Sequence, residues 1–411
     1  MTSGRACVVT GAGIISPLGR GLEATRAALA AGRSGIAPIG AFDAAGFPVL
    51  CAGEVRDARI PRGSARQAVL ADVALAEALA QAQLEVAATA DAGRAVSFAF
   101  GKPTVDLEML AAHAAAWRAA CDPELLPREV PGLAAARQEA DPATLLRRLG
   151  RAVGAGGPLY SSYTACASGN DALGLGKRLI ERGQAEVVIA GATDSQVHPL
   201  SLIEFELLSA LSHEPAARAC RPFDRQRTGF VVGEGAAVLV LESAEHARAR
   251  GARPLARIAG YGSSLDCHGL TKCHPQGRGA AQAMRAALAD AGARPEQIDY
   301  VNAHGTGTVL NDQSEAAALH AVWGEAVARL PVSSTKAMTG HLLTAASAIE
   351  AVITLIALSD GLLPPNLNFE HPDPECELNL VTAPRQGARL AHAMSNGFGF
   401  GGQNSSLILA A

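Results

Sequence analysis

The chain is poor in aromatic side chains, in charge and in long apolar runs. Aromatic residues make up 4% of its 411 residues and charged residues 18%, with a formal net charge of −4. A chain without a basic excess lacks the field that attracts nucleic acid, so we expect no nucleic-acid partner. The longest apolar runs, such as 351–358, fall far short of the roughly 20 residues that a membrane helix needs. We therefore expect no membrane association.

Cysteine is also sparse, with eight residues at irregular spacings. This pattern argues against a disulfide framework and favours reduced thiols, which predicts a cytoplasmic setting. The opening MTSGRACVVTGAG has no charged segment followed by a long apolar stretch, so no signal peptide is expected.

Small and apolar residues dominate, and 49% of the chain is hydrophobic. Short β-branched runs predict strands at 7–13, 95–101, 186–192, 236–242, 300–306 and 331–336. Helical spacing appears at 22–31, 66–83, 169–182, 280–291, 312–328 and 345–359. The alternation predicts an α/β fold whose strands are buried and largely parallel.

Two segments resemble each other, RACVVTGAGIISPLG at 5–19 and ARIAGYGSSLD at 256–266. Each is an apolar strand that runs into a Gly/Ser turn. The echo predicts a duplicated α/β unit with halves at 1–255 and 256–411. Residues 117–157 have no clear period and predict an irregular insertion or cap.

Cys166 lies where an extended segment, PLYSSYT, turns into a helix that starts at Ser168. Unpaired N–H groups at a helix N-terminus stabilise a thiolate and can hold a developing oxyanion. Taken alone, Cys166 is better explained as a small buried apolar residue, which is the usual role of a free cysteine.

Two histidines change this balance. His304 ends the strand in YVNAHGTGT, and His341 opens an Ala-rich helix after VSSTKAMTG. A thiolate can accept an acyl group, and two imidazoles can stabilise the enolate that forms when a malonyl thioester loses CO₂. Lys336 either keeps His341 neutral by repulsion or is an ion-pair partner, for example of Glu350.

With these motifs the chain resembles the elongating β-ketoacyl–acyl carrier protein synthases of the thiolase-like superfamily. The matching motifs are TACASG at Cys166, VNAHGTGT at His304, SSTKAMTGH at Lys336 and His341, FDRQRTGFVVGEGAAVLVLE at 223–242 and SNGFGFGGQNSSLIL at 395–409. The resemblance implies a duplicated five-layered α/β/α/β/α fold, a dimer, and an acyl carrier protein as partner. It also implies a decarboxylative Claisen condensation without a cofactor or a catalytic metal.

The resemblance further implies the roles of single residues. Cys166 carries the acyl chain, and its N–H and that of Phe400 form the oxyanion hole. Phe400 gates the acyl pocket together with Gly399 and Gly401.

A second loop at 263–275, with Asp266, His268 and Thr271, faces this gate by the same resemblance. Thr306 and Thr308 hydrogen-bond the phosphopantetheine arm. Asp312, Glu315 and Glu350 support the site from behind. In some relatives a monovalent cation lies near the positions of Asn302, Glu350 and Asn396.

The chain departs from this family pattern at 101–157 and at Ser209, where a carrier-contacting Arg is common. We therefore expect a specialised ketosynthase, for example for a polyene or polyketide, that forms a homodimer or pairs with a related subunit. The main alternative is a non-catalytic, chain-length-determining partner subunit, although such subunits lack the nucleophile.

Two other functions fit less well. Gly11 and Gly13 begin like a dinucleotide-binding fingerprint, but Ser16 occupies the third glycine position. We interpret the two glycines as a tight turn after a strand. The second alternative is a zinc site formed by the Cys-His pairs at 267–268 and 273–274, whose spacing does not match zinc modules.

Overall fold

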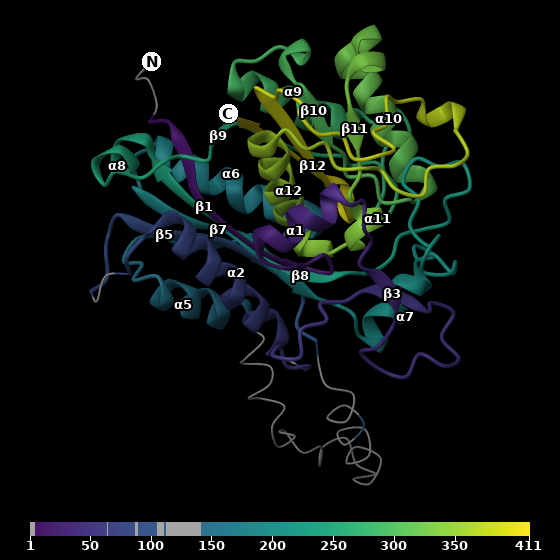
Figure 1. The fold of residues 1–411 in the computed structure, drawn as a ribbon, viewed down its shortest axis with the longest axis horizontal. Coiled ribbons are helices and arrows are strands. Elements are labelled where there is room, and N and C mark those ends of the chain that lie inside the picture. The colour runs from purple at the N-terminus through teal and green to yellow at the C-terminus, as the bar shows by residue number, and fades with distance from the viewer. Residues whose placement is uncertain (1–4, 64, 87–88, 105–110, 112–140) are drawn as a thin grey trace.

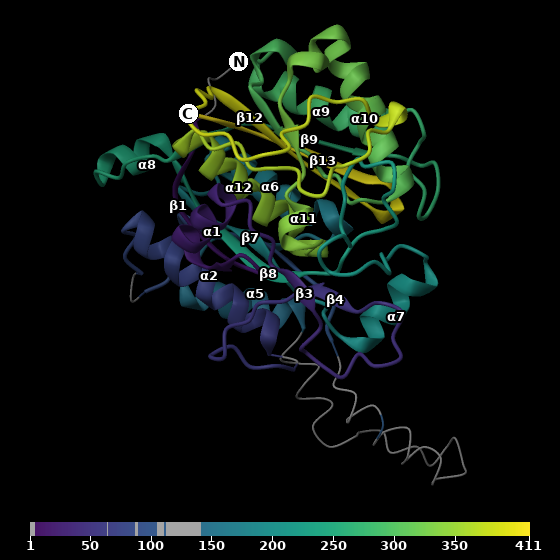
Figure 2. The ribbon, with the colours of Figure 1, turned by 45° about the vertical axis from the view of Figure 1, so that its right-hand side comes forward.

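The computed structural model describes residues 5–63, 65–86, 89–104, 111 and 141–411. They form five layers, with a helical layer between two half-sheets and further helices on both outer faces (Figures 1 and 2). The main helices of these layers are α2 (Arg66–Ala82) and α5 (Pro142–Ala152) outside the first half-sheet, α6 (Ser168–Glu181) and α12 (Ala346–Asp360) in the middle, and α9 (Arg278–Ala291) and α10 (Val309–Trp323) outside the second.

The two half-sheets have the same strand order. The first runs β6 (Leu159–Ser161), β5 (Arg94–Phe100), β7 (Val187–Ser195), β8 (Glu234–Ser243) and β1 (Cys7–Ser16). The second runs β11 (Val332–Ser333), β10 (Tyr300–Asn302), β12 (His392–Gly399), β13 (Gln403–Ala410) and β9 (Ala256–Leu265). Each strand of the second half has a counterpart in the first, in the same chain order, so the fold is duplicated.

The prediction of largely parallel strands is wrong for half of these pairings. In each half two pairs are parallel, β5 with β6 and β7, and β10 with β11 and β12. The other two pairs of each half are antiparallel. They are β7–β8 and β8–β1 in the first half, and β12–β13 and β13–β9 in the second. For β12 and β13 the reason is local, because the short turn Phe400–Gly402 joins them and a short turn joins only antiparallel strands.

The half-sheets meet where β1 pairs antiparallel with β9, through Val8–Arg257 and Val9–Ala256. The echoing segments of the sequence are therefore the two adjacent strands at the centre of the molecule. The division between residues 255 and 256 stays a prediction, and β9 begins at Ala256.

Gly11 and Gly13 do not form the predicted turn, because both lie inside β1. A Cβ atom on Gly11 would lie 2.2 Å from the carbonyl oxygen of Ala78, and one on Gly13 would lie 2.0 Å from that of Ala74. The two glycines therefore let α2 pack directly on the strand.

The middle layer depends on a similar close contact. A Cβ atom on Gly169, in the first turn of α6, would lie 2.3 Å from the main-chain nitrogen of Ala348 in α12. Both helices follow a 3₁₀ turn, at Ala165–Ala167 and Leu343–Ala345. The first residue of each turn has a positive φ, 48° at Ala165 and 50° at Leu343, which a non-glycine residue adopts only when its surroundings hold it there.

Part of the segment predicted to be irregular is helical. Asp141 caps α5 by accepting a hydrogen bond from the N–H of Thr144 at 2.7 Å, and Pro142 occupies the first turn. Leu145 and Leu149 are buried against the first half-sheet. The remainder of the predicted cap at 101–157 lies largely outside the described residues.

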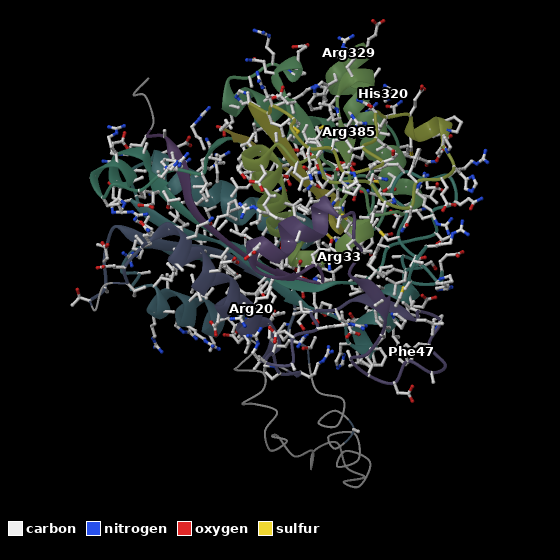
Figure 3. The ribbon with its side chains drawn as sticks, in the orientation of Figure 1. Arg20, Arg33, Phe47, His320, Arg329 and Arg385 are labelled. Carbon is white, nitrogen blue, oxygen red and sulfur yellow. The ribbon has the colours of Figure 1, made fainter. Side chains whose placement is uncertain are left out.

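The remaining elements are β2 (Gly19–Arg20), α1 (Gly21–Ala30), β3 (Ile36–Pro38), β4 (Cys51–Gly53), α7 (Pro199–Leu207), α8 (Ala244–Ala249) and α11 (Lys336–Thr339). One stretch among the described helical residues, Leu343–Asp360, is long and apolar enough to cross a membrane, but it is mostly buried inside the protein. Its apolar side chains belong to the central core. The labelled arginines Arg20, Arg33, Arg329 and Arg385 lie at separate places on the molecule (Figure 3).

Candidate active site

Cys166 lies in the 3₁₀ turn that leads into α6, as its place in the sequence predicted. The positive φ of Ala165 makes the turn sharp, and Gly399 packs against it, since a Cβ on Gly399 would lie 3.0 Å from the main-chain nitrogen of Cys166. The N–H of Phe400 hydrogen-bonds the Cys166 thiol. Two main-chain N–H groups, those of Cys166 and Phe400, thus lie beside the sulfur, as an oxyanion hole requires.

His341 contacts the thiol directly. Its Nε2 atom lies 3.1 Å from Sγ of Cys166, and its ring packs edge-on against Phe230 at 5.1 Å between centroids. The main-chain N–H of Leu343 donates to Nδ1 of His341 at 3.3 Å. Because Nδ1 accepts a hydrogen bond, we assign the proton of the neutral ring to Nε2, which therefore donates toward the sulfur.

His304 completes the group. Its ring lies 5.2 Å from that of His341, nearly perpendicular to it, and the side-chain ligand atoms of Cys166, His304 and His341 lie within 4.8 Å of one another. Glu315, from α10, fixes the main chain at this point by accepting hydrogen bonds from the N–H groups of His304 at 2.9 Å and Gly305 at 2.7 Å. The Nδ1 atom of His304 is buried and has no hydrogen-bond partner among the described residues.

Lys336 is fully buried behind the histidines, with its side chain 0% exposed. Its Nζ atom donates to the carbonyl oxygen of His304 at 2.5 Å and forms an ion pair with Glu350 of α12. The sequence left two roles for Lys336 open, and the geometry is compatible with both. The ion pair with Glu350 is present, and the ammonium charge lies close enough to influence both histidines.

The ionisation states follow from burial. Burial and the nearby Lys336 lower the pKa of both His304 and His341 well below the usual 6.5. Burial raises the pKa of Cys166 to about 12, against the opposing effects of Lys336 and the Phe400 N–H. The expectation of a thiolate stabilised by the helix N-terminus is therefore wrong for the resting site, because desolvation outweighs the favourable groups. At neutral pH the site holds a thiol and two neutral imidazoles.

A cavity of about 530 Å³ opens onto these residues. Its lining includes Cys166, His304, His341, Thr306, Thr308, Thr271, Gly399, Phe400 and Gly401. The two predicted gating loops both contribute to its lining and are hydrogen-bonded directly to each other. The N–H of Gly401 donates to the carbonyl of Leu270 at 2.7 Å, and the N–H of Asp266 donates to the carbonyl of Gly402 at 2.6 Å.

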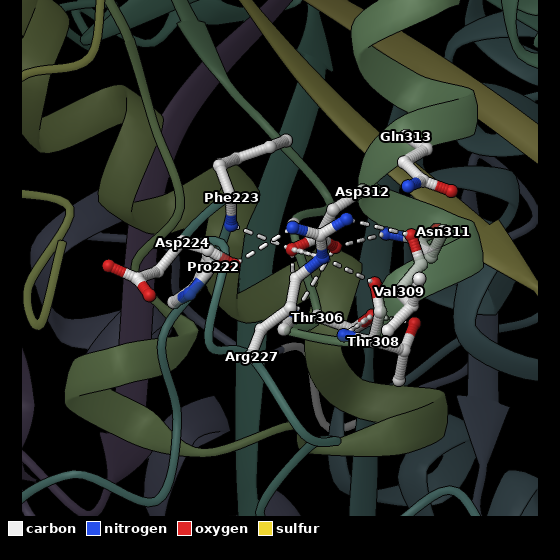
Figure 4. A network of polar contacts seen from close by, with 12 residues as sticks. Pro222, Phe223, Asp224, Arg227, Thr306, Thr308, Val309, Asn311, Asp312 and Gln313 are labelled. Carbon is white, nitrogen blue, oxygen red and sulfur yellow. Dashed lines mark hydrogen bonds and ion pairs between the residues drawn. The ribbon is translucent and has the colours of Figure 1, made fainter. Parts of the chain in front are cut away.

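Thr306 and Thr308 lie side by side on the cavity wall, with their hydroxyl oxygens 2.8 Å apart. Buried Asp312 holds their loop from behind by accepting hydrogen bonds from Gly307 and from Phe223, and Arg227 lies 3.8 Å from its carboxylate (Figure 4). The loop that carries the two threonines is thus held by hydrogen bonds to Asp312, whose negative charge is compensated by Arg227.

The positions that match the cation site of some relatives contain unsatisfied oxygens. Three buried atoms have no hydrogen-bond partner among the described residues, namely Oδ1 and Nδ2 of Asn302 and Oε2 of Glu350. Asn396 instead donates to Glu315 at 3.1 Å and accepts from Ser406. Amide and carboxylate oxygens suit a hard cation, so Asn302 and Glu350 fit such an ion as a structural ligand.

The predicted alternative at the Cys-His pairs forms no cluster. Among the described residues, the one group with metal-ligand spacing is Cys166, His304 and His341. The rings of His268 and His274 do meet, at 5.1 Å. Cys273 lines the cavity, as does Ser209, which has a positive φ of 52°.

Sequence reasoning missed several cavity residues. Among them are Lys102, Asp194 and Gln196, which lie in none of the motifs that we identified. Lys102 follows β5, and Asp194 and Gln196 lie at the end of β7. Only their position at the ends of adjacent parallel strands, where α/β folds place ligands, points to them.

The chain matches two family models. Residues 5–247 match the N-terminal domain of beta-ketoacyl synthase, and residues 255–370 match its C-terminal domain. Among curated proteins, the 3-oxoacyl-(acyl-carrier-protein) synthase 2 of Staphylococcus aureus is 36% identical over 99% of both chains. The enzyme of the same name from Synechocystis is 37% identical over 97% of this chain and 96% of its own.

Solved structures agree. A type II polyketide acyl-carrier protein in complex with its ketosynthase matches with a TM-score of 0.89 and 30% identity over 99% of both chains. The ishigamide ketosynthase/chain length factor matches with a TM-score of 0.87 and 34% identity, again over 99% of both. With matches this complete to both halves, and the paired Cys and His motifs in one cavity, the chain belongs to the beta-ketoacyl synthase family.

Proposed function

We propose that this protein catalyses the decarboxylative Claisen condensation of an acyl thioester on Cys166 with malonyl–acyl carrier protein. The product is a β-ketoacyl–acyl carrier protein, as in fatty acid or polyketide chain elongation. The observation that carries the proposal is the contact of 3.1 Å between His341 Nε2 and Cys166 Sγ, with His304 beside them at the floor of one cavity.

In the first half-reaction the sulfur of Cys166 attacks the carbonyl carbon of the incoming thioester. The oxyanion of the tetrahedral intermediate accepts hydrogen bonds from the N–H groups of Cys166 and Phe400. The bond to the pantetheine sulfur then breaks. The proton of the Cys166 thiol leaves, in net terms, on the pantetheine thiol, so charge is balanced.

In the second half-reaction malonyl–acyl carrier protein loses CO₂, and the electron pair of the broken bond forms an enolate. Its oxygen accepts hydrogen bonds from His341 Nε2–H and from the His304 ring, which must be neutral to avoid competing proton transfer. The enolate carbon attacks the thioester on Cys166. The carbon–sulfur bond breaks, and the released thiolate takes up one proton.

Lys336, Thr306 and Thr308 have supporting roles in this proposal. Lys336 holds the His304 main chain and disfavours protonated imidazoles through its charge. The paired hydroxyls of Thr306 and Thr308 offer hydrogen bonds to a phosphopantetheine arm that enters the cavity. Phe400, Gly399 and Gly401 gate the acyl pocket together with the loop of Thr271, and all four residues line the cavity. No cofactor is needed, because both substrates arrive as thioesters.

The partners that we propose are an acyl carrier protein and a second ketosynthase-like chain. One structural neighbour is, by its title, a ketosynthase in complex with an acyl-carrier protein, and another is a ketosynthase with its chain length factor from Xenorhabdus doucetiae, at 28% identity and a TM-score of 0.78. The second chain is either another copy or a related subunit. We propose a cytoplasmic location, which agrees with the sparse and irregularly spaced cysteines.

Intact-mass spectrometry tests the function. Incubation with an octanoyl–acyl carrier protein should add one octanoyl group to the protein, on Cys166, and later addition of malonyl–acyl carrier protein should release it as a β-ketoacyl product. A chain that forms no adduct is instead a non-catalytic partner subunit. The contact of Cys166 with His341, and the position of His304 within 4.8 Å, disfavour that alternative.

A further inference from the structure

The cavity wall contributed by the first half of the chain contains a polar cluster. Lys102 comes from the loop after β5, and Asp194 and Gln196 come from the end of β7. All three line the cavity that contains Cys166. Thr306 and Thr308 line the same cavity from the second half of the chain.

Two members of the cluster, Gln196 and Asp194, already form hydrogen bonds within the protein. Gln196 donates from Nε2 to the carbonyl oxygen of Lys102 at 2.7 Å, and its Oε1 accepts from the hydroxyl of Ser201, also at 2.7 Å. Asp194 accepts hydrogen bonds from the N–H groups of Ser195 at 2.8 Å and Thr344 at 3.0 Å. These bonds fix the backbone from which the Lys102 side chain projects.

The ammonium group of Lys102 is the member of the cluster that can still donate a hydrogen bond to a ligand. Its ion-pair partner among the described residues is Glu204 of α7, whose side chain is 57% exposed. An ammonium group has three donors, and an exposed carboxylate can exchange its partner for water at little cost. Burial lowers the pKa of Lys102, while the charge of Asp194 opposes this effect. A ligand atom that accepts a hydrogen bond therefore gains a donor that is already partly desolvated.

The cavity also has an apolar part. Phe205, Phe230 and Phe398 line it, and Phe230 and Phe398 pack on the rings of His341 and His304 respectively. An acyl chain on Cys166 thus meets aromatic walls near the sulfur and a cationic donor elsewhere on the wall. A wholly saturated hydrocarbon chain would displace water from the Lys102–Glu204 ion pair without offering the ammonium group a further acceptor, which is unfavourable.

We propose that Lys102 is a specificity-determining residue that selects acyl chains with an oxygen function, such as a hydroxyl or keto group, over saturated hydrocarbon chains. This inference rests on the proposed function and assigns its substrate class. Lys102 touches the acyl chain remote from the reacting carbon and takes no part in bond formation.

The test compares two thioesters of N-acetylcysteamine, octanoyl and terminally hydroxylated octanoyl, as acyl donors to the purified full chain. Initial rates of adduct formation on Cys166 are followed by intact mass. We expect the hydroxylated chain to react about tenfold faster, the ratio that one hydrogen bond to a charged donor provides. Lys102→Met should bring the ratio close to one by slowing the hydroxylated chain and accelerating the octanoyl chain.

Glu204→Gln is the matched control, because it removes the ion-pair partner of Lys102 but keeps the ammonium group, so the ratio should stay at or above that of the wild type. Equal rates in the wild-type protein, or a ratio that survives Lys102→Met, would overturn the assignment of Lys102 while leaving the proposed function intact. Failure of both thioesters to acylate Cys166, when an acyl carrier protein substrate also fails, would instead remove the proposed function.

Discussion

Lys336 donates a hydrogen bond from Nζ to the main-chain carbonyl oxygen of His304 at 2.5 Å, while its charge is balanced by Glu350. The same side chain therefore positions one histidine and contributes to the lowered pKa of both. A buried cation with these two effects links the geometry of the site to its pH dependence.

Replacing both members of this ion pair should shift the acid limb of the pH–rate profile. Each histidine pKa is lowered, so the imidazoles are neutral at pH 7 and become protonated only well below 6.5. Lys336→Met combined with Glu350→Gln removes the repulsive charge without leaving a lone carboxylate. Both histidine pKa values should then rise, and condensation should fall off at a higher pH than in the wild type.

The control for this change is Lys177→Met, which removes another buried lysine, paired with Glu181 and Asp290 away from the histidines. Its acid limb should match that of the wild type. If the double variant at 336 and 350 also keeps the wild-type limb, Lys336 acts on His304 through position alone.

Cys166→Ala should abolish the acyl adduct and chain extension, because no other group in the cavity replaces the thiol as acyl carrier. Slow decarboxylation of malonyl–acyl carrier protein should persist, since His304 and His341 remain. Mass spectrometry of the carrier protein measures both outcomes. Chain extension by this variant would refute the role of Cys166.

Replacing His304 and replacing His341 should affect different steps of the reaction. His304→Ala should still allow acylation of Cys166 but reduce condensation by roughly 10²–10³-fold, the usual cost of losing one oxyanion donor. His341→Ala should slow both steps, because its Nε2 contacts the sulfur at 3.1 Å. Single-turnover adduct formation and product release are measured separately. Loss of acylation in His304→Ala would make His304 the base of the thiol.

Two neighbouring glycines provide a matched test of the gate. Gly401 and Gly402 both have positive φ, 81° and 76°, but only at Gly402 would a Cβ collide with Asp266, at 1.8 Å from its carbonyl oxygen. Gly402→Ala should separate the two loops and change acylation far more than Gly401→Ala, while backbone strain affects both equally. Similar acylation rates in the two variants would show that the contact between the loops has no gating role.

Native mass spectrometry of the purified chain, alone and with the products of neighbouring genes, tests the pairing. We expect a mixed dimer that is more active in condensation than the chain alone. A stable and fully active homodimer would contradict this expectation.

Sequence patterns were sufficient for the elements around the site, though not for all of their ends. The helix after Cys166 begins at Ser168, as predicted. The other two positions are shifted, because β10 ends at Asn302, two residues before His304, and His341 lies before α12 instead of at its start. Strand direction was not predictable in the same way, because a buried strand is apolar on both faces whether its neighbours are parallel or antiparallel. The helix α5 was missed since Pro142 and several arginines obscure its apolar face, although Asp141 and Pro142 together form a helix-start signal.

Some residues of the candidate site could likewise be predicted from the sequence, and others could not. Cys166, His304 and His341 could be identified because each lies in a distinctive motif. Asp194 and Gln196 could not, because they reach the cavity only through the pairing of β7 with its neighbours. The ionisation of Cys166 was also misjudged, since desolvation depends on how deeply the folded chain buries the sulfur.

The contact between Gly169 and Ala348 has a consequence for how this site can change over evolution. Cys166 lies three residues before Gly169, and His341 lies shortly before α12, so the packing of the two helices sets the spacing between sulfur and imidazole. Any side chain at 169 would push the helices apart and lengthen the distance between the two reacting groups. The chemistry is thus tied to the central core, whereas the walls formed by Lys102 and the outer loops are free to diverge and to acquire new substrates.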